Sequence, residues 1–184
     1  DLDVTHASLD MGCLLEALNR PGVRLPATLT SLHVGTNKLP RAASAALAEL
    51  LSKAGPLRQL GIARTQLLGE SFELVFAALR ANGRLNALAL DASENELGEK
   101  CARTLARSLG ADAASAEPTR CTLCGLRLRA TSLAEGGVGA LLGPLGPSLV
   151  QLDLSHNMRK KIVPWPSEAV EIGAALADLL RRCT

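Results

Sequence analysis

The sequence predicts an α/β fold in which short strands and helices alternate along a right-handed stack, with a parallel sheet on its concave face. Two observations predict this fold. An apolar phrase recurs along the chain, and after each copy the spacing of apolar residues changes from that of a strand to that of a helix. Hydrophobic residues make up 47% of the 184-residue chain and aromatic residues only 2%, which predicts an aliphatic core.

The recurring phrase has the pattern L-x-x-L-x-L-x-x-(N/T)-x-L. The first leucines of its five copies are Leu29, Leu57, Leu85, Leu123 and Leu149. The first leucines of successive copies are 28, 28, 38 and 26 residues apart. The two equal spacings are the strongest evidence for a repeat. The chain also opens with this phrase, without the first leucine. The pattern therefore predicts about six strand–helix repeats.

The third copy is the irregular one. Aligned on its first leucine, it has Leu88 and Leu90 as the two inward leucines of the strand. The turn residue Asn95 then follows after two extra residues. This alignment predicts that Leu88 lies beside Leu60 of the preceding strand.

The residue pattern of each repeat has a physical explanation. In L-x-L the two leucines point to one side of a strand and the residue between them points to the other. An Asn at the turn can bond to main-chain groups there, whereas Thr65 and Thr131 can do so only in part. One strand–helix unit cannot cover its own apolar face, so the units must stack. We therefore expect residues 1–184 to form one domain, a fragment of a longer solenoid with flanking repeats.

Three segments interrupt the repeat. Residues 20–28 contain proline and are expected to form a loop between the first helix and the second strand. Residues 110–120 are small and polar and are expected to form a flexible insertion. Residues 158–166 separate the last strand from the last helix.

Composition excludes several classes of function. Lys and Arg number 20 and Asp and Glu 18, which is too even a balance to predict a nucleic-acid partner. No apolar run reaches the length of about 20 residues that a membrane-spanning helix needs. The chain shows no signal peptide, and its five cysteines are odd in number and scattered. These features favour reduced thiols in the cytosol or nucleus, and we expect a cytoplasmic location.

Catalytic and metal-binding patterns are sparse. Cys121 and Cys124 form a CxxC motif, but no second ligand pair follows at zinc-site spacing. His6 and His33 are expected on neighbouring strands, about 5 Å apart, with no third ligand. The sequence lacks the phosphate-loop, zinc-protease and nucleophile-elbow motifs. We therefore expect no catalytic, cofactor or metal site, and a protein that is not an enzyme.

Polar side chains on the strands predict a binding surface for a protein partner. Residues between and just after the inward leucines should project from the concave face, where such stacks usually bind. Among them, the candidate partner-binding residues are His33, Arg64, Arg127, Arg129 and His156. Their charges alternate with acidic residues, as in a protein interface, whereas a phosphate backbone would need a continuous basic stripe.

The loop after the last strand is a second candidate. It places Arg159, Lys160, Lys161 and Trp165 in a segment that two prolines stiffen. Trp and Arg are enriched among interface hot spots, and a stiff loop loses less entropy on binding. The alternative is that Trp165 folds back as a lid over the last helix while the cations are solvated.

The repeat phrase resembles the ribonuclease-inhibitor class of leucine-rich repeats over nearly the whole chain. Within that class, residues 51–109 resemble the repeat domain of the capping-protein and myosin-I linker proteins, the CARMIL family. The resemblance implies a leucine-rich-repeat solenoid and a scaffold for protein–protein interaction, with actin-cytoskeleton regulation as its setting. A Ran-type GTPase-activating protein, the sensor repeats of a NOD-like receptor and a tropomodulin-like protein are the alternatives.

Overall fold

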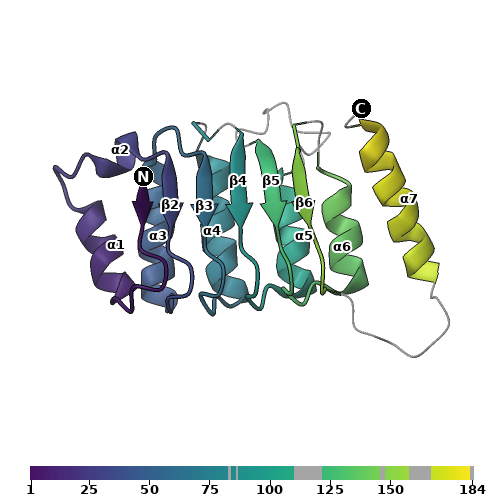
Figure 1. The fold of residues 1–184 in the computed structure, drawn as a ribbon, viewed down its shortest axis with the longest axis horizontal. Coiled ribbons are helices and arrows are strands. Elements are labelled where there is room, and N and C mark those ends of the chain that lie inside the picture. Colours follow the sequence, from purple (N-terminus) through teal and green to yellow (C-terminus); the bar gives the residue numbers. More distant parts are fainter. Residues whose placement is uncertain (83, 86, 110–121, 146–147, 158–166, 183–184) are drawn as a thin grey trace.

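The structure is a computed structural model, and it describes residues 1–82, 84–85, 87–109, 122–145, 148–157 and 167–182 (Figure 1). Short strands alternate with helices from one end to the other. The strands are β1 (Leu2–Asp3), β2 (Ser31–His33), β3 (Gln59–Gly61), β4 (Leu88–Asp91), β5 (Leu123–Arg127) and β6 (Gln151–Asp153). The helices are α1 (Met11–Asn19), α2 (Leu25–Thr28), α3 (Arg41–Lys53), α4 (Gly69–Ala81), α5 (Gly98–Leu109), α6 (Ala134–Leu142) and α7 (Ser167–Arg182).

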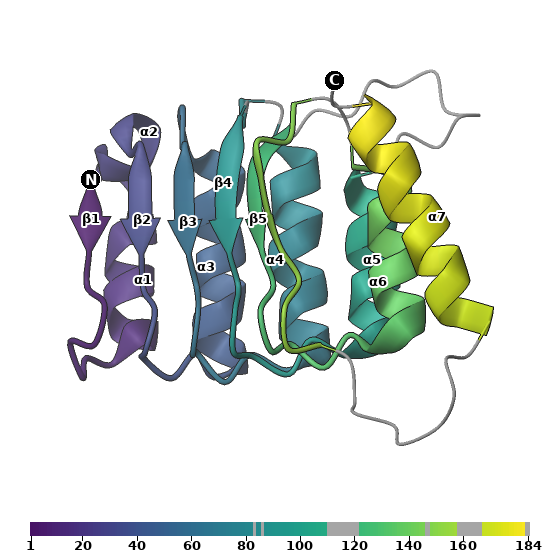
Figure 2. The same ribbon diagram turned by 45° about the vertical axis from the view of Figure 1, so that its right-hand side comes forward.

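The strands form one six-stranded sheet in the order of the sequence, and every pair is parallel. A parallel neighbour requires the chain to return along a crossover, which a helix supplies each time. Among the described residues, the helices lie together on one side of the sheet and leave the other side uncovered (Figures 1 and 2). The α/β class is thus as predicted, and the arrangement is compatible with a strand–helix repeat.

The strand register corrects the predicted alignment of the third copy. Leu60 pairs with Leu90 and not with Leu88, so the two extra residues precede the strand instead of following it. A turn at Ala87, whose φ is 55°, takes up the extra chain, and its N–H donates to the Thr122 hydroxyl at 2.9 Å. With this register Asn95 follows Leu90 by five residues, as Asn37 follows Leu32.

The predicted loop over residues 20–28 is partly wrong. Its second half is the short helix α2, which has a proline in its first turn. Proline suits that position because its φ is already helical and its missing N–H would have no partner within the helix. The predicted insertion at residues 110–120 and the break at residues 158–166 lie outside the described residues.

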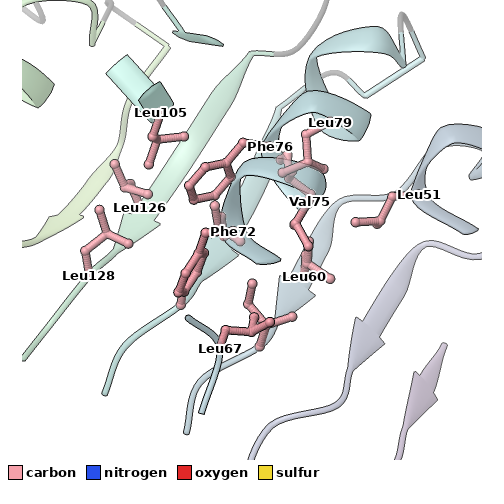
Figure 3. Close-up of a cluster of buried hydrophobic side chains, with 14 of the residues drawn as sticks. Leu51, Leu60, Leu67, Phe72, Val75, Phe76, Leu79, Leu105, Leu126 and Leu128 are labelled. Atoms are coloured by element: carbon pink, nitrogen blue, oxygen red, sulfur yellow. The ribbon is translucent and has the colours of Figure 1, made fainter. Parts of the chain in front are cut away.

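The core lies between the sheet and the helices. It is mostly Leu and Ala, as predicted, but the two phenylalanines are its largest fully buried side chains. Phe72 and Phe76 project from α4 towards the sheet, with ring centroids 5.4 Å apart (Figure 3). Leucines of β3, β5 and the segment after each strand surround them (Figure 3). None of the helices within the described residues is long and apolar enough to cross a membrane.

Candidate binding surface

The uncovered side of the sheet, called the sheet face below, carries one row of residues in register across all six strands. Each row member directly follows the inward-facing leucine of its strand, so it lies on the side of the strand away from the helices. The row consists of Asp3, His33, Gly61, Asp91, Arg127 and Asp153. We call it the central row. Arg127 lies between Asp91 and Asp153 in this row, and His33 lies beside Asp3, which makes the sheet face polar and mixed in charge.

Three aspartates of the central row also shape the backbone. Asp3, Asp91 and Asp153 each accept a hydrogen bond from the N–H two residues further on, at 2.9, 3.0 and 2.9 Å. The N–H and then the hydroxyl of Ser155 lower the pKa of Asp153, and the charges of Arg129 and Arg127 lower it further. The three carboxylates are therefore held in place at the surface, and hydrogen bonds from Thr5 likewise lower the pKa of Asp3.

Arg127 lies between two of these aspartates. Its guanidinium is 4.0 Å from the Asp91 carboxylate and donates to the side-chain oxygen of Gln151 at 3.1 Å. Asp153 is its neighbour on the other side. The arginine is thus held across three strands while its side chain remains about half exposed, at 49%.

Arg64 and Glu94 form the best-defined ion pair on this side of the molecule. Nε and Nη2 of Arg64 donate to the two carboxylate oxygens of Glu94 at 2.7 and 2.8 Å. This bidentate geometry lowers the pKa of Glu94, mainly through the hydrogen bond from Arg64, and raises the pKa of Arg64. The positive charge of Arg129 also acts on Glu94. The predicted arginines therefore lie among carboxylates.

A second row follows the strands where the chain turns towards the helices. One residue of every repeat unit has a positive φ at the same register position, between 50° and 59°: His6, Thr36, Arg64, Glu94, Ala130 and His156. None of the six is glycine. This left-handed conformation is costly for a side chain with a Cβ, by about 1 kcal/mol, and it persists because the neighbouring strands fix it. It sets the direction in which Arg64, Glu94 and His156 project.

His33 occupies the sheet face, but not beside His6. The N–H of His6 bonds to the carbonyl of Gly35 at 3.0 Å, which places His6 opposite Thr36. The expected pairing of His6 and His33 is therefore wrong. Because residue 61 is glycine, the His33 ring can lie over it, with Nε2 3.4 Å from the side-chain oxygen of Gln59.

Within the described ranges, no three His, Cys, Asp or Glu side chains gather in a way that could hold a metal ion. Cys124 is a free thiol that donates to the main-chain oxygen of Ala87 at 3.2 Å. It therefore helps to close the turn before β4. Cys121, its partner in the CxxC motif, lies outside the described residues.

A pocket of about 570 Å³ opens at the β6 end of the stack. Apolar side chains of β6, α6 and α7 line most of it: Val138, Leu142, Leu152, Leu154, Ile172 and Leu176. Asp153 and His156 lie at its polar rim. The sequence marks these leucines as apolar, but it does not show that the last helix leaves space beside the last strand.

A second pocket, of about 480 Å³, lies across the beginnings of α3, α4 and α5. Two ion pairs cross this surface, Arg41 with Glu70 at 3.0 Å and Lys100 with Glu73 at 3.8 Å. Cys101 lines its floor as a buried thiol whose pKa is raised by burial. A protonated thiol of this kind is a poor nucleophile.

The structure brings four of the predicted partner-binding residues onto or beside the sheet face: His33, Arg64, Arg127 and Arg129. His156 lies further along, at the rim of the β6 pocket. The remaining predicted residues, Arg159, Lys160, Lys161 and Trp165, lie outside the described residues. No protein-family model matches the chain, and no curated protein matches it.

Proposed function

We propose that this chain is a leucine-rich-repeat solenoid of the ribonuclease-inhibitor class that binds a protein partner through its sheet face. The observation that carries the proposal is the set of arginines held in place there. Arg64 is fixed by both oxygens of Glu94, and Arg127 by Asp91 and Gln151. These side chains lose less freedom on binding than unpaired arginines would.

The charge pattern supports a protein partner over a nucleic acid. Asp91 and Asp153 lie on either side of Arg127 in the central row. A phosphate backbone would be repelled by these carboxylates, whereas a protein can match alternating charges with its own. Binding of this kind uses no bound cofactor or metal and no catalytic step. Actin-cytoskeleton regulation in the cytoplasm, which the CARMIL resemblance implies, is the narrower form of the proposal.

The proposal is tested with one pair of matched variants. The sheet-face variant carries Arg127→Gln and Arg129→Gln, and the control carries Arg80→Gln and Arg107→Gln on exposed positions of α4 and α5. Both lose two positive charges. Proteins retained from a cell extract by the immobilised wild-type chain are purified and titrated against all three forms by calorimetry.

We expect a partner whose Kd rises at least about tenfold for the sheet-face variant and less than about twofold for the control. Melting temperatures of the three free proteins show whether each variant is folded. A partner that binds all three forms equally, or that is lost only with the control, would overturn the proposal.

A further inference from the structure

Arg129 is the charged member of a row whose other members are small. This row, called the third row below, lies between the central row and the second row, whose residues have positive φ. Each of its carbonyls accepts a hydrogen bond from the N–H of a second-row residue of the preceding unit, at 2.8–3.0 Å. Its members are Gly35, Ala63, Ser93, Arg129 and Ser155. The small neighbours leave the exposed side chain of Arg129 open to approach.

The main chain that carries Arg129 is fixed from the strands on both sides. Its N–H donates to the hydroxyl of Ser93 at 3.3 Å, and its carbonyl accepts from the N–H of Glu94 at 2.8 Å. On the β6 side, the N–H of Ala130 donates to the carbonyl of Ser155 at 2.9 Å. Arg129 therefore projects from a defined position inside the sheet, with a paired strand on each side.

The carboxylates nearest to Arg129 are already bonded to other groups. Both oxygens of Glu94 accept from Arg64, and Asp153 accepts from the N–H of Ser155. Arg129 acts on these two carboxylates only through its charge, which adds to the hydrogen bonds that lower their pKa. Among the described residues, its guanidinium has no hydrogen bond or ion pair. It thus differs from Arg64 and Arg127, which are held by side chains of this protein.

The surroundings of Arg129 favour an incoming group with a single negative charge. A carboxylate can accept two parallel hydrogen bonds from a guanidinium. A phosphate group carries roughly two negative charges and would be repelled more strongly by Asp91, Glu94 and Asp153. In the second row Ala130 follows Arg129 directly, and its methyl group leaves space that a longer side chain would fill.

We propose that Arg129 binds the side-chain carboxylate of an Asp or Glu of the partner protein. Arg64 and Arg127 keep their own partners and form a fixed surface around the new ion pair. The proposal rests on the proposed function, because it needs a partner on the sheet face, and it adds which residue type of the partner is recognised. Recognition of this kind supplies specificity, since an uncharged side chain would leave the guanidinium covered and unpaired.

The test uses an array of short immobilised peptides in which the central position is fixed and the others are random. The central residue is Asp, Glu, Asn, Gln, Lys or phosphoserine, and all of these peptides are amidated at the C-terminus. One further set has a central Gln and a free C-terminal carboxylate. The array is probed with the labelled wild-type protein, with Arg129→Gln and Arg129→Glu, and with the control Arg80→Gln on an exposed position of α4.

We expect the wild-type protein and Arg80→Gln to bind the Asp and Glu sets at least about fivefold more strongly than the Asn and Gln sets. Arg129→Gln should abolish this preference, and Arg129→Glu should shift it to the Lys set. Melting temperatures show that each variant is folded.

Several results would overturn the proposal. They are no binding to any set, equal binding of the acidic and amide sets, and an acidic preference that survives in Arg129→Gln. Stronger binding of the phosphoserine set, or of the free C-terminal carboxylate, would also do so. If the acidic preference is absent while the captured partner still loses affinity for the sheet-face variant, only the role of Arg129 is lost. A captured partner that binds every form equally removes the proposed function instead.

Discussion

Asn95 accepts hydrogen bonds from both the main-chain N–H and the hydroxyl of Thr65, at 2.9 and 3.1 Å, across one strand spacing. Its Nδ2 donates to the carbonyls of Ile62 and Ala92 at 2.8 and 3.0 Å, one in each strand–helix unit. Asn157 has the same relationship to Thr131, at 2.8 and 3.1 Å. Each threonine in these turns is thus hydrogen-bonded to the asparagine of the next strand–helix unit.

Replacing Asn95 should be strongly destabilising. Asn95→Ala leaves several buried main-chain groups without partners, at about 1–3 kcal/mol each, so we expect a loss of about 3 kcal/mol or more. Thr65→Val removes only a hydroxyl and should cost about 1 kcal/mol. Urea unfolding followed by circular dichroism measures both. A loss below about 1 kcal/mol for Asn95→Ala would show that these bonds contribute little.

Two glycines offer a comparison of close packing with open space. A Cβ at Gly55 would collide with the main-chain oxygen of Ala27 in α2, whereas nothing lies within 4 Å of a Cβ at Gly139 in α6. Gly55→Ala should therefore destabilise the protein by about 1–3 kcal/mol. Gly139→Ala should stabilise it by about 0.5–1 kcal/mol, because alanine is the better helix former. Melting temperatures that move in the same direction would contradict this packing.

Phe72 and Phe76 on α4 should contribute a large part of the free energy of unfolding that comes from the core. Phe72 and Phe76 are fully buried and contact each other (Figure 3). Phe72→Ala should cost about 3–5 kcal/mol, and Phe72→Leu clearly less, because leucine leaves a smaller cavity. Chemical unfolding of the two variants gives the difference. Equal losses would mean that the cavity does not determine the cost.

Acid should lower the stability of the folded protein through the carboxylates on and beside the sheet face. The pKa of Glu94 is lowered from its ordinary value of 4.5, chiefly by the hydrogen bond from Arg64, and the pKa values of Asp3 and Asp153 are lowered from 3.8. Because the folded-state values are the lower ones, the stabilisation is fully present above the unfolded values and is lost as the pH falls through the folded values.

The pH effect is measured as the melting temperature between about pH 3 and pH 7. Glu94→Gln should flatten the lower part of this curve, and Glu16→Gln on α1 serves as the control. A wild-type melting temperature that rises on acidification below about pH 4.5 would contradict the assignment.

The sequence predicts the alternation of strands and helices well because period-2 and period-3.6 apolar spacings are local signals. It misaligns β4, the strand of the third copy, because Leu88 and Leu90 both satisfy the apolar pattern. Pairing with Leu60 decides between them, and that pairing joins residues 30 positions apart. The short helix α2 was missed because its four residues are too few to show a helical period.

The binding surface is predictable only in part for a similar reason. Arg64 was identified by its place after a strand, but its partner Glu94 lies 30 residues away, and only the finished register brings the two together. The apolar pocket beside β6 depends on where α7 packs against α6, and no local pattern encodes that spacing.

The most direct test of the sheet face as binding surface is carboxyl labelling with and without the captured partner, quantified residue by residue by mass spectrometry. Asp91, Glu94 and Asp153 lie on or beside the sheet face, whereas Glu49 and Glu99 lie on α3 and α5. We expect the partner to reduce labelling of the first three residues severalfold and to leave labelling of Glu49 and Glu99 unchanged. Protection of Glu49 and Glu99, with Asp91, Glu94 and Asp153 labelled as in the free protein, would contradict it.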